Sequence, residues 1–362
     1  MSDTDTALQA LGTFAAAHET PWPRDPAAAP APGQQPFGVH HNDPPPFNRA
    51  LGPLHVRGGP SGVVWQQGRE RLAWGDPERA DQTFSVAKTY LALLAGIAHA
   101  RGLLPDVNEP VARRLPGIGL DDTPHNAAVT WQHLLQQTSE WEGTCLGLPD
   151  RVDRWRQVGN DPRPPDPNAG RKGDARPLRP PGTYWEYNDV RINQLSLALL
   201  HLFGRALPEV FDEALMQPLG ATSRWRWEGY DDAWVDLAGR RVQSVPGGTH
   251  WGAGVSIGAR DQARIAQLWL DEGRCGGRAV IDNGWPRYLR EPCPIAPFYG
   301  GLVWLNGSGS LFAAASREAF AMLGAGGHLV LVEPAQQAVV VARWLDPAAT
   351  GEFVERALAA LR

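Results

Sequence analysis

A serine and a lysine at the head of a long apolar run constrain the fold of this chain more than any other feature. From residue 83 the sequence reads TFSVAKTY and continues into an apolar stretch over residues 91–98. Apolar side chains cover most of the circumference of the helix that this stretch predicts, so the helix must be buried on nearly all sides. Ser85 and Lys88 are three residues apart near its start, which brings the hydroxyl and the amine within hydrogen-bonding reach on one face.

Ser85 and Lys88 together have the chemistry of a nucleophile beside a base. A serine hydroxyl attacks a carbonyl poorly until its proton is removed, and burial of a lysine disfavours the charged form of its amine. The same spacing arises by chance in many helices, so the pair alone does not establish a catalytic site.

The chain divides into an N-terminal segment and one larger domain. Residues 6–17 carry apolar side chains at helical spacing, and residues 21–60 are so rich in proline, glycine and alanine that no regular element fits them. We therefore expect residues 1–60 to form a helix and an extended arm across the body, and residues 61–362 to form the main domain.

Strand patterns occur at both ends of the main domain, and helical patterns occur in its middle. Residues 62–66 and 71–75 predict a hairpin. Strands are expected over 251–257, 299–305, 319–323, 328–332 and 338–344, and helices over 130–139, 190–203, 207–216, 260–270 and 352–361. This order predicts an α/β (α+β) fold, in which segments 61–82 and 250–362 form an antiparallel sheet, about 103–237 forms a helical insertion, and a cleft lies between the two.

Charge and cysteine usage narrow the classes of partner. The net charge of -5 is spread over interspersed signs, so neither a nucleic acid nor a membrane is expected as a partner. Three widely separated cysteines predict neither a disulfide framework nor a zinc site, and we expect no metal or other cofactor. The N-terminus is acidic and no apolar run reaches membrane-spanning length, which predicts a cytoplasmic protein. The sequence leaves the oligomeric state open.

Two further segments form a set of three sequence motifs together with Ser85 and Lys88. Residues 181–183 (PGT) lead to Tyr187, Asn188 and Asp189, and residues 324–328 (GAGGH) precede a predicted strand. Together with SVAK at 85–88, these segments resemble the serine β-lactamase and penicillin-binding-protein superfamily, in its class C-like branch, which includes family VIII esterases and 6-aminohexanoate-dimer hydrolases. The resemblance runs in order from about residue 62 to the C-terminus, and it implies a β-lactamase/transpeptidase-like fold with an antiparallel sheet flanked by helices and an inserted, mostly helical subdomain.

The resemblance also implies roles for individual residues. Ser85 would become acylated, and Lys88 would hold or accept its proton. Tyr187 would relay a proton to the leaving group and help to activate water. The oxyanion hole would combine the backbone N–H of Ser85 with one from the strand around Gly324 and Ala325.

The sequence departs from the family pattern at two positions. Asp189 stands where the family usually has an asparagine, and an ionised carboxylate cannot donate a hydrogen bond to a substrate carbonyl. Asp189 either pairs with Lys88 and holds it charged, or caps a helix away from the cleft. Leu323, Gly324 and Ala325 stand in place of the Lys-Thr-Gly that recognises the carboxylate of β-lactams, so an anionic drug would lose its main charge-assisted contact.

Three more side chains are candidates for the same site. Trp141 and Trp185 are expected to shape the substrate cleft. His328 either reaches the cleft or points into the core.

These patterns predict an enzyme of the serine hydrolase class that acts on a small ester or amide rather than primarily on a β-lactam. One alternative is a true β-lactamase or D-amino-acid peptidase. Another, from a different class, is a non-catalytic protein that binds a peptide or cell-wall fragment.

Overall fold

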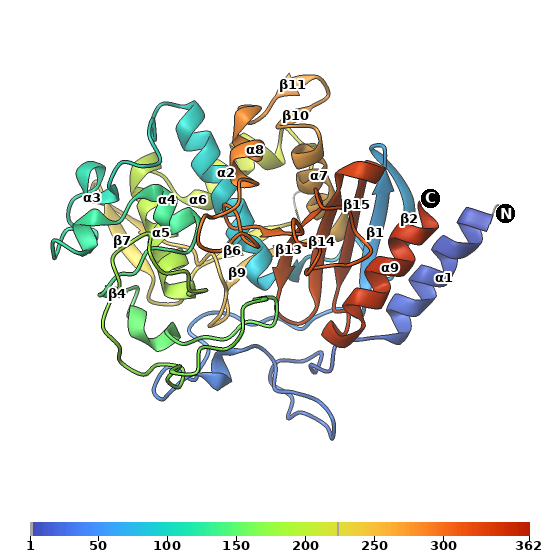
Figure 1. Ribbon diagram of the computed structural model, residues 1–362, viewed down its shortest axis with the longest axis horizontal. Coiled ribbons are helices and arrows are strands. Elements are labelled where there is room, and N and C mark those ends of the chain that lie inside the picture. The colour runs from blue at the N-terminus through green and yellow to red at the C-terminus, as the bar shows by residue number, and fades with distance from the viewer. Residues whose placement is uncertain (1–2, 223) are drawn as a thin grey trace.

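A six-stranded antiparallel sheet forms the centre of one half of the molecule in the computed structural model, which describes residues 3–222 and 224–362 (Figure 1). Its strand order is β12-β13-β14-β15-β1-β2. The bounds are β1 Ser61–Gln66, β2 Arg69–Trp74, β12 Trp304–Leu305, β13 Phe320–Gly324, β14 His328–Glu333 and β15 Ala338–Arg343. The predicted hairpin and the last three predicted strands are thus confirmed.

Alternation along the strands gives the sheet two buried faces. On β14, Leu329 and Leu331 belong to one apolar cluster, while Val330 and Val332 belong to another, as the two-residue period of a strand requires. The first face packs against α1 (Asp3–Ala17) and α9 (Thr350–Ala360), which lie side by side along the sheet (Figure 1). The second face packs against α7 (Ala259–Leu270).

Helix α2 (Ala87–Ala100) lies between the sheet and the helical half of the molecule (Figure 1). All of its residues from Ala87 to Ala98 are buried, which confirms the prediction from its apolar circumference. The helical half holds α3 (Val111–Arg114), α4 (Trp131–Leu135), α5 (Asp189–Phe203) and α6 (Leu207–Phe211), which continues as a π-helical turn over Asp212–Met216. The short α8 (Gly284–Leu289) packs against α2.

Several small strands fall outside the predicted plan. β9 (Gly254–Ile257) pairs with both β3 (Asp81–Gln82) and β6 (Arg226–Glu228) in a separate three-stranded sheet. The expectation that segments 61–82 and 250–362 build one sheet was therefore wrong at these two places. The insertion is also not purely helical, because it and the following segments carry three small hairpins: Thr144–Cys145 with Leu148–Pro149 (β4, β5), Trp234–Leu237 with Arg240–Gln243 (β7, β8), and Arg274–Cys275 with Arg278–Ala279 (β10, β11).

Three predicted elements are shorter in the structure, and one of them, the strand expected over 251–257, begins only at Gly254. The segment 299–305 is a strand only at Trp304–Leu305, because Leu302 has a left-handed backbone (φ 60°) and breaks the extended conformation. The helix predicted over 130–139 begins as expected with Thr130 as its cap, but it ends at Leu135. No helix in the described ranges is long and apolar enough to cross a membrane.

The N-terminal arm runs from the sheet to the helical half (Figure 1). At one end the N–H of Thr20 donates to the carbonyl of Trp344, which follows β15. Further along, the N–H groups of Leu51 and Gly52 both donate to the carbonyl of Trp251. The arm therefore contacts both parts that border the predicted cleft.

Candidate active site

Ser85 lies in a strained turn at the head of α2. A 3₁₀ turn, Phe84–Val86, joins the small sheet to the helix, and Phe84 has a left-handed backbone with φ of 50°. This conformation is uncommon for a residue with a bulky side chain. The Phe84 ring is buried among Trp22 and Phe37 of the arm and Trp344, while Ser85 itself stays partly exposed.

Lys88 contacts both Ser85 and Asp189, the carboxylate that the sequence left open as either a partner of Lys88 or a helix cap. Its Nζ donates to Ser85 Oγ at 2.9 Å, one helical turn away. The same nitrogen lies 2.5 Å from Asp189 Oδ1, and both side chains are only 1% exposed. The structure therefore joins Ser85, Lys88 and Asp189 in one line of contacts.

Asp189 is a partner of Lys88 and not a helix cap. The cap of α5 is Asn188, whose side-chain oxygen accepts from the N–H groups of Val190 and Arg191. Burial alone would raise the pKa of the Asp189 carboxyl, but the charges of Arg156 and Lys88 outweigh it and hold that pKa well below its ordinary value. Asp189 is thus ionised, and it faces Lys88 as a counterion.

Tyr187 lies between two cations. Lys88 Nζ is 4.5 Å from the centre of its ring, and the Arg156 guanidinium is 5.1 Å from it. Among the described residues, the Tyr187 hydroxyl makes no hydrogen bond with Ser85 or any other group. The hydroxyl is therefore available to a bound molecule.

A cavity of about 540 Å³ opens over Ser85. Tyr187 and Arg156 line it from the helical half, and Leu323, Gly324 and Ala325 line it from the end of β13. Gly324 fits there because a Cβ at this position would lie 2.2 Å from the carbonyl oxygen of Thr83, in the turn that carries Ser85. The close approach of β13 to the serine thus requires glycine.

The comparison with family models agrees with this arrangement. The model described as Beta-lactamase matches residues 53–359. The chain belongs to the beta-lactamase family. No curated protein matches the chain.

Solved structures of similar fold cover between 82% and 99% of the chain. EstCE1, described as a hydrolase with promiscuous acyltransferase activity, is 16% identical with a TM-score of 0.62, covering 99% of this chain and 100% of its own. A penicillin-binding protein homologue from Caulobacter crescentus is 15% identical with a TM-score of 0.62, covering 99% and 98%. A D-stereospecific amidohydrolase from Streptomyces sp. is 14% identical with a TM-score of 0.55, covering 82% and 93%. At these identities the likeness shows the fold.

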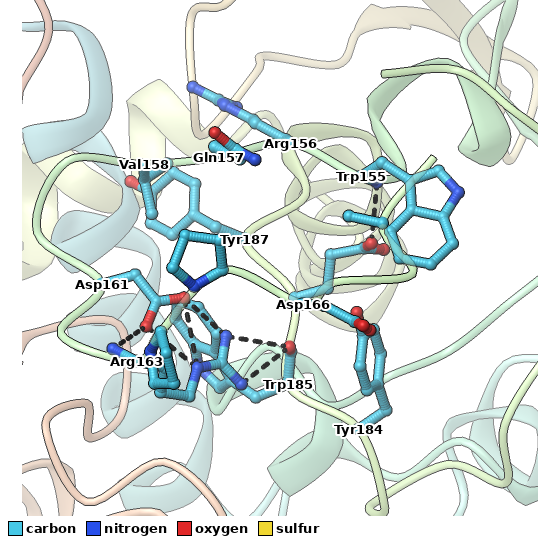
Figure 2. Close-up of a pocket in the computed structure, with 14 residues that line it drawn as sticks. Trp155, Arg156, Gln157, Val158, Asp161, Arg163, Asp166, Tyr184, Trp185 and Tyr187 are labelled. Carbon is cyan, nitrogen blue, oxygen red and sulfur yellow. Dashed lines mark hydrogen bonds and ion pairs between the residues drawn. The ribbon is translucent and has the colours of Figure 1, made fainter. Parts of the chain in front are cut away.

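Trp185 and Trp141, the two tryptophans expected to shape the substrate cleft, lie in different parts of the structure. Trp185 lines a second cavity of about 310 Å³, which shares Arg156, Val158 and Tyr187 with the cavity over Ser85. In Figure 2, Asp161 and Arg163 pair on one side of this second cavity, and Trp155 and Tyr184 lie on the other.

Trp141 lines neither cavity, so the expectation that it shapes the cleft was wrong. Its side chain is 1% exposed, and its indole N–H donates to the carbonyl of Gly119. The ring fills the core under the loop that follows α4, because Gly143 leaves room beside it.

His328 contributes to the wall of the Ser85 cavity while its ring is buried. The ring packs edge-on against Trp344 at 4.4 Å, and neither ring nitrogen has a hydrogen-bond partner among the described residues. Burial, with the charges of Arg343 and Arg57, holds the pKa of His328 well below its ordinary value. The structure thus places a neutral histidine behind the cavity wall.

Sequence reasoning missed Arg156 and Asp153. Arg156 lies 3.0 Å from Asp189 Oδ2 and 3.0 Å from Asp153 Oδ2, so it links the two carboxylates beside Lys88. Both residues come from a segment with many arginines and acidic residues. No periodic pattern in this segment distinguishes the charged residues that reach the site from those that do not. Only the fold of this segment against α5 brings them to the site.

Proposed function

We propose that this protein is a serine hydrolase that forms an acyl-enzyme at Ser85 on a small ester or amide, and that β-lactams are not its main substrates. The observation that carries this proposal is the 2.9 Å contact between Ser85 Oγ and a buried Lys88, at the wall of a cavity large enough for a small substrate. Structural neighbours described as a hydrolase and as a D-stereospecific amidohydrolase support it.

The contacts favour different roles for Lys88 and Tyr187 in the reaction. Because Lys88 Nζ lies 2.5 Å from Asp189 Oδ1 and donates to Ser85 Oγ, we assign it the role of stabilising the Ser85 oxygen rather than removing its proton. Tyr187 has two cations beside its ring, where negative charge would develop if its hydroxyl lost a proton.

The proposed reaction then has two halves. Tyr187, as phenolate, takes the Ser85 proton while Oγ bonds to the substrate carbonyl carbon. The tyrosine returns that proton to the leaving group as the ester or amide bond breaks. In the second half, a water molecule gives a proton to Tyr187 while its oxygen bonds to the acyl carbon, and Tyr187 passes that proton to Ser85 Oγ as the bond from Oγ to the acyl carbon breaks and the acid leaves. Backbone N–H groups of Ser85 and Ala325 are proposed to hold the oxyanion.

The wall of the cavity supports the exclusion of β-lactams as main substrates. Leu323 lines it from the end of β13, where the family pattern has a carboxylate-binding lysine. An apolar side chain there offers no charge-assisted contact to a drug carboxylate.

The test is covalent labelling of Ser85 by a fluorophosphonate, followed by mass spectrometry. Wild type is expected to gain one adduct and to hydrolyse p-nitrophenyl esters faster than nitrocefin, and Ser85→Ala is expected to lose both adduct and turnover. Folded wild type that gains no adduct, but binds a peptide or cell-wall fragment as well as Ser85→Ala does, would instead be a binding protein. Nitrocefin turnover as fast as ester turnover would favour a true β-lactamase.

A further inference from the structure

The chain uses lysine at only two positions. Of its 34 lysine and arginine residues, only Lys88 and Lys172 are lysines. An ammonium is a compact point charge, whereas a guanidinium is broad and planar, so the two cations are not interchangeable in a tight site. Both lysines lie in the same network of buried charges, which indicates that the network requires this compact cation at two points.

The Lys172 ammonium occupies a cage of three buried side chains. It contacts Asp43 of the arm, and its Nζ is 3.0 Å from Asp153 Oδ1 and 3.2 Å from His250 Nε2. Donor atoms of Asp43, Asp153 and His250 all lie within 4.8 Å of one another, a spacing that would suit a metal ion. Here the ammonium takes the place of the cation. The Lys172 side chain is 18% exposed, so the cage is reachable from solvent.

The cage contacts both the backbone and the side chain of Asp189. The N–H of Asp189 donates to Asp153 Oδ2 at 2.7 Å. His250 Nδ1 lies 3.5 Å from Asp189 Oδ2, while its Nε2 lies 2.7 Å from Asp43 Oδ2. Asp189 in turn contacts Lys88. Asp189 therefore connects the cage to Lys88, which in turn contacts Ser85.

Removal of the Lys172 charge would leave this network unbalanced. Among the described residues, the carboxylates of Asp43, Asp153 and Asp189 would then keep Lys88, Arg156 and His250 as their remaining ion-pair partners. Buried carboxylates without a counterion repel one another and tend to move apart or take up protons. Either response would displace Asp189 from Lys88.

We propose that Lys172 is a positioning residue, whose ammonium serves as the cation of the Asp43–Asp153–His250 cage and so fixes Asp189 against Lys88. The inference rests on the proposed function of Ser85. Under this proposal, two further parts of the chain help to hold the active-site residues in place. They are the N-terminal arm, through Asp43, and the irregular segment that carries Lys172.

The experiment replaces the ammonium and then returns it from solution. Lys172→Ala removes three methylenes and the amine, which is the volume of n-propylammonium. The matched control is Arg171→Ala, because the exposed Arg171 side chain makes no ion pair or hydrogen bond among the described residues. The readouts are the rate of Ser85 labelling by the fluorophosphonate, the thermal midpoint, and the Nζ resonance of Lys88 in protein labelled with ¹⁵N-lysine.

We expect Lys172→Ala to slow labelling by about 10- to 100-fold, since a misplaced catalytic group costs on this order. It should also shift the Lys88 Nζ resonance, and n-propylammonium should reverse both changes, while Arg171→Ala changes neither. Asp43→Asn combined with Lys172→Ala should abolish the rescue, because the cage would lose a carboxylate. Should Lys172→Ala not fold, Lys172→Met, which keeps the packed stem, is judged by labelling rate and resonance alone.

The inference fails if wild type is labelled and folded Lys172→Ala is labelled equally fast, or if n-propylammonium restores nothing. The proposed function fails separately if wild type itself is not labelled at Ser85. In that case the Lys88 resonance still decides the inference: an Nζ signal unchanged by Lys172→Ala would overturn it.

Discussion

The carboxylate of Asp189 lies 2.5 Å from the ammonium of Lys88, in a place where each side chain is only 1% exposed. Water does not screen such a pair, so each charge depends on the other for its stability. This contact explains how the site tolerates an aspartate where the family usually has an asparagine. The acidic residue pairs with Lys88 inside the protein.

Asp189→Asn is expected to destabilise the protein although it restores the family residue. The amide leaves Lys88 and Arg156 without their shared counterion, and breaking a buried pair typically costs about 3–5 kcal/mol. Chemical denaturation should show this loss, together with slower labelling of Ser85. The control Asp161→Asn breaks a surface pair with Arg163 and should cost about 1 kcal/mol or less. Equal stability of Asp189→Asn and wild type would contradict the prediction.

Acid should unfold the protein partly through Asp153. Burial would raise the pKa of this carboxyl, but the charges of Arg156 and Lys172 lower it to about 2. Because the folded-state pKa is depressed, the stabilisation is present above the unfolded value of about 3.9 and is lost as pH falls towards 2. Asp153→Asn should therefore show a shallower loss of unfolding free energy than wild type between about pH 4 and 2. Parallel pH profiles of the two proteins would rule this out.

His328 should make the protein less stable in mild acid. Its folded-state pKa lies well below the ordinary value of about 6.5, because burial and the charges of Arg343 and Arg57 disfavour the imidazolium. Stability from this group is present above pH 6.5 and falls below it, by up to about 1.4 kcal/mol per pH unit. His328→Phe should remove this slope, since its neighbours Trp344 and Phe84 are aromatic. Denaturant midpoints at pH 7 and 5 measure the difference between variant and wild type.

The sequence predicts the elements of this fold better than the surroundings of the serine. Local periodicity was sufficient for the buried helix α2 and for the hairpin of β1 and β2, because each element reports its own burial pattern. The Ser85–Lys88 contact was also predictable, since three residues of helix fix its geometry. Asp43, Lys172 and His250 meet only through the tertiary path of the arm and of irregular segments, which no periodic pattern encodes. The rarity of lysine is a sequence signal that could have drawn attention to Lys172, but none of the sequence-based predictions used it.

Gly324→Ala should separate β13 from the serine. The added Cβ would lie 2.2 Å from the backbone carbonyl of Thr83, which cannot rotate away as a side chain could. Because the turn that carries Ser85 must move, we expect the kcat/KM for an ester to fall by about 10- to 100-fold. Gly307→Ala is the control, since its Cβ would meet nothing within 4 Å, and it should retain activity. An unchanged kcat/KM in Gly324→Ala would show that this contact does not set the position of Ser85.

Trp22→Ala tests whether the N-terminal arm holds the serine turn in its strained form. Trp22 is 5% exposed, and its ring lies 5.3 Å from that of Phe84, whose φ is 50°. A left-handed backbone costs about 1–2 kcal/mol in a non-glycine residue, so the packing of the arm must outweigh it. Loss of the indole should lower stability by about 3–5 kcal/mol and slow the labelling of Ser85, because Phe84 can then relax.

The control for Trp22→Ala is the same substitution at an exposed tryptophan. Trp234 is 43% exposed on the β7–β8 hairpin, so Trp234→Ala should cost about 1 kcal/mol or less and leave the labelling rate unchanged. Thermal melts and labelling at a temperature where both variants are folded separate the two effects. If Trp22→Ala lowers the melting temperature but its folded form is labelled as fast as wild type, the arm stabilises the fold without setting the geometry of Ser85. Slower labelling of that folded form is the result we expect, because Phe84 directly precedes Ser85, the proposed nucleophile, and a change in the Phe84 backbone angle would redirect the Ser85 side chain.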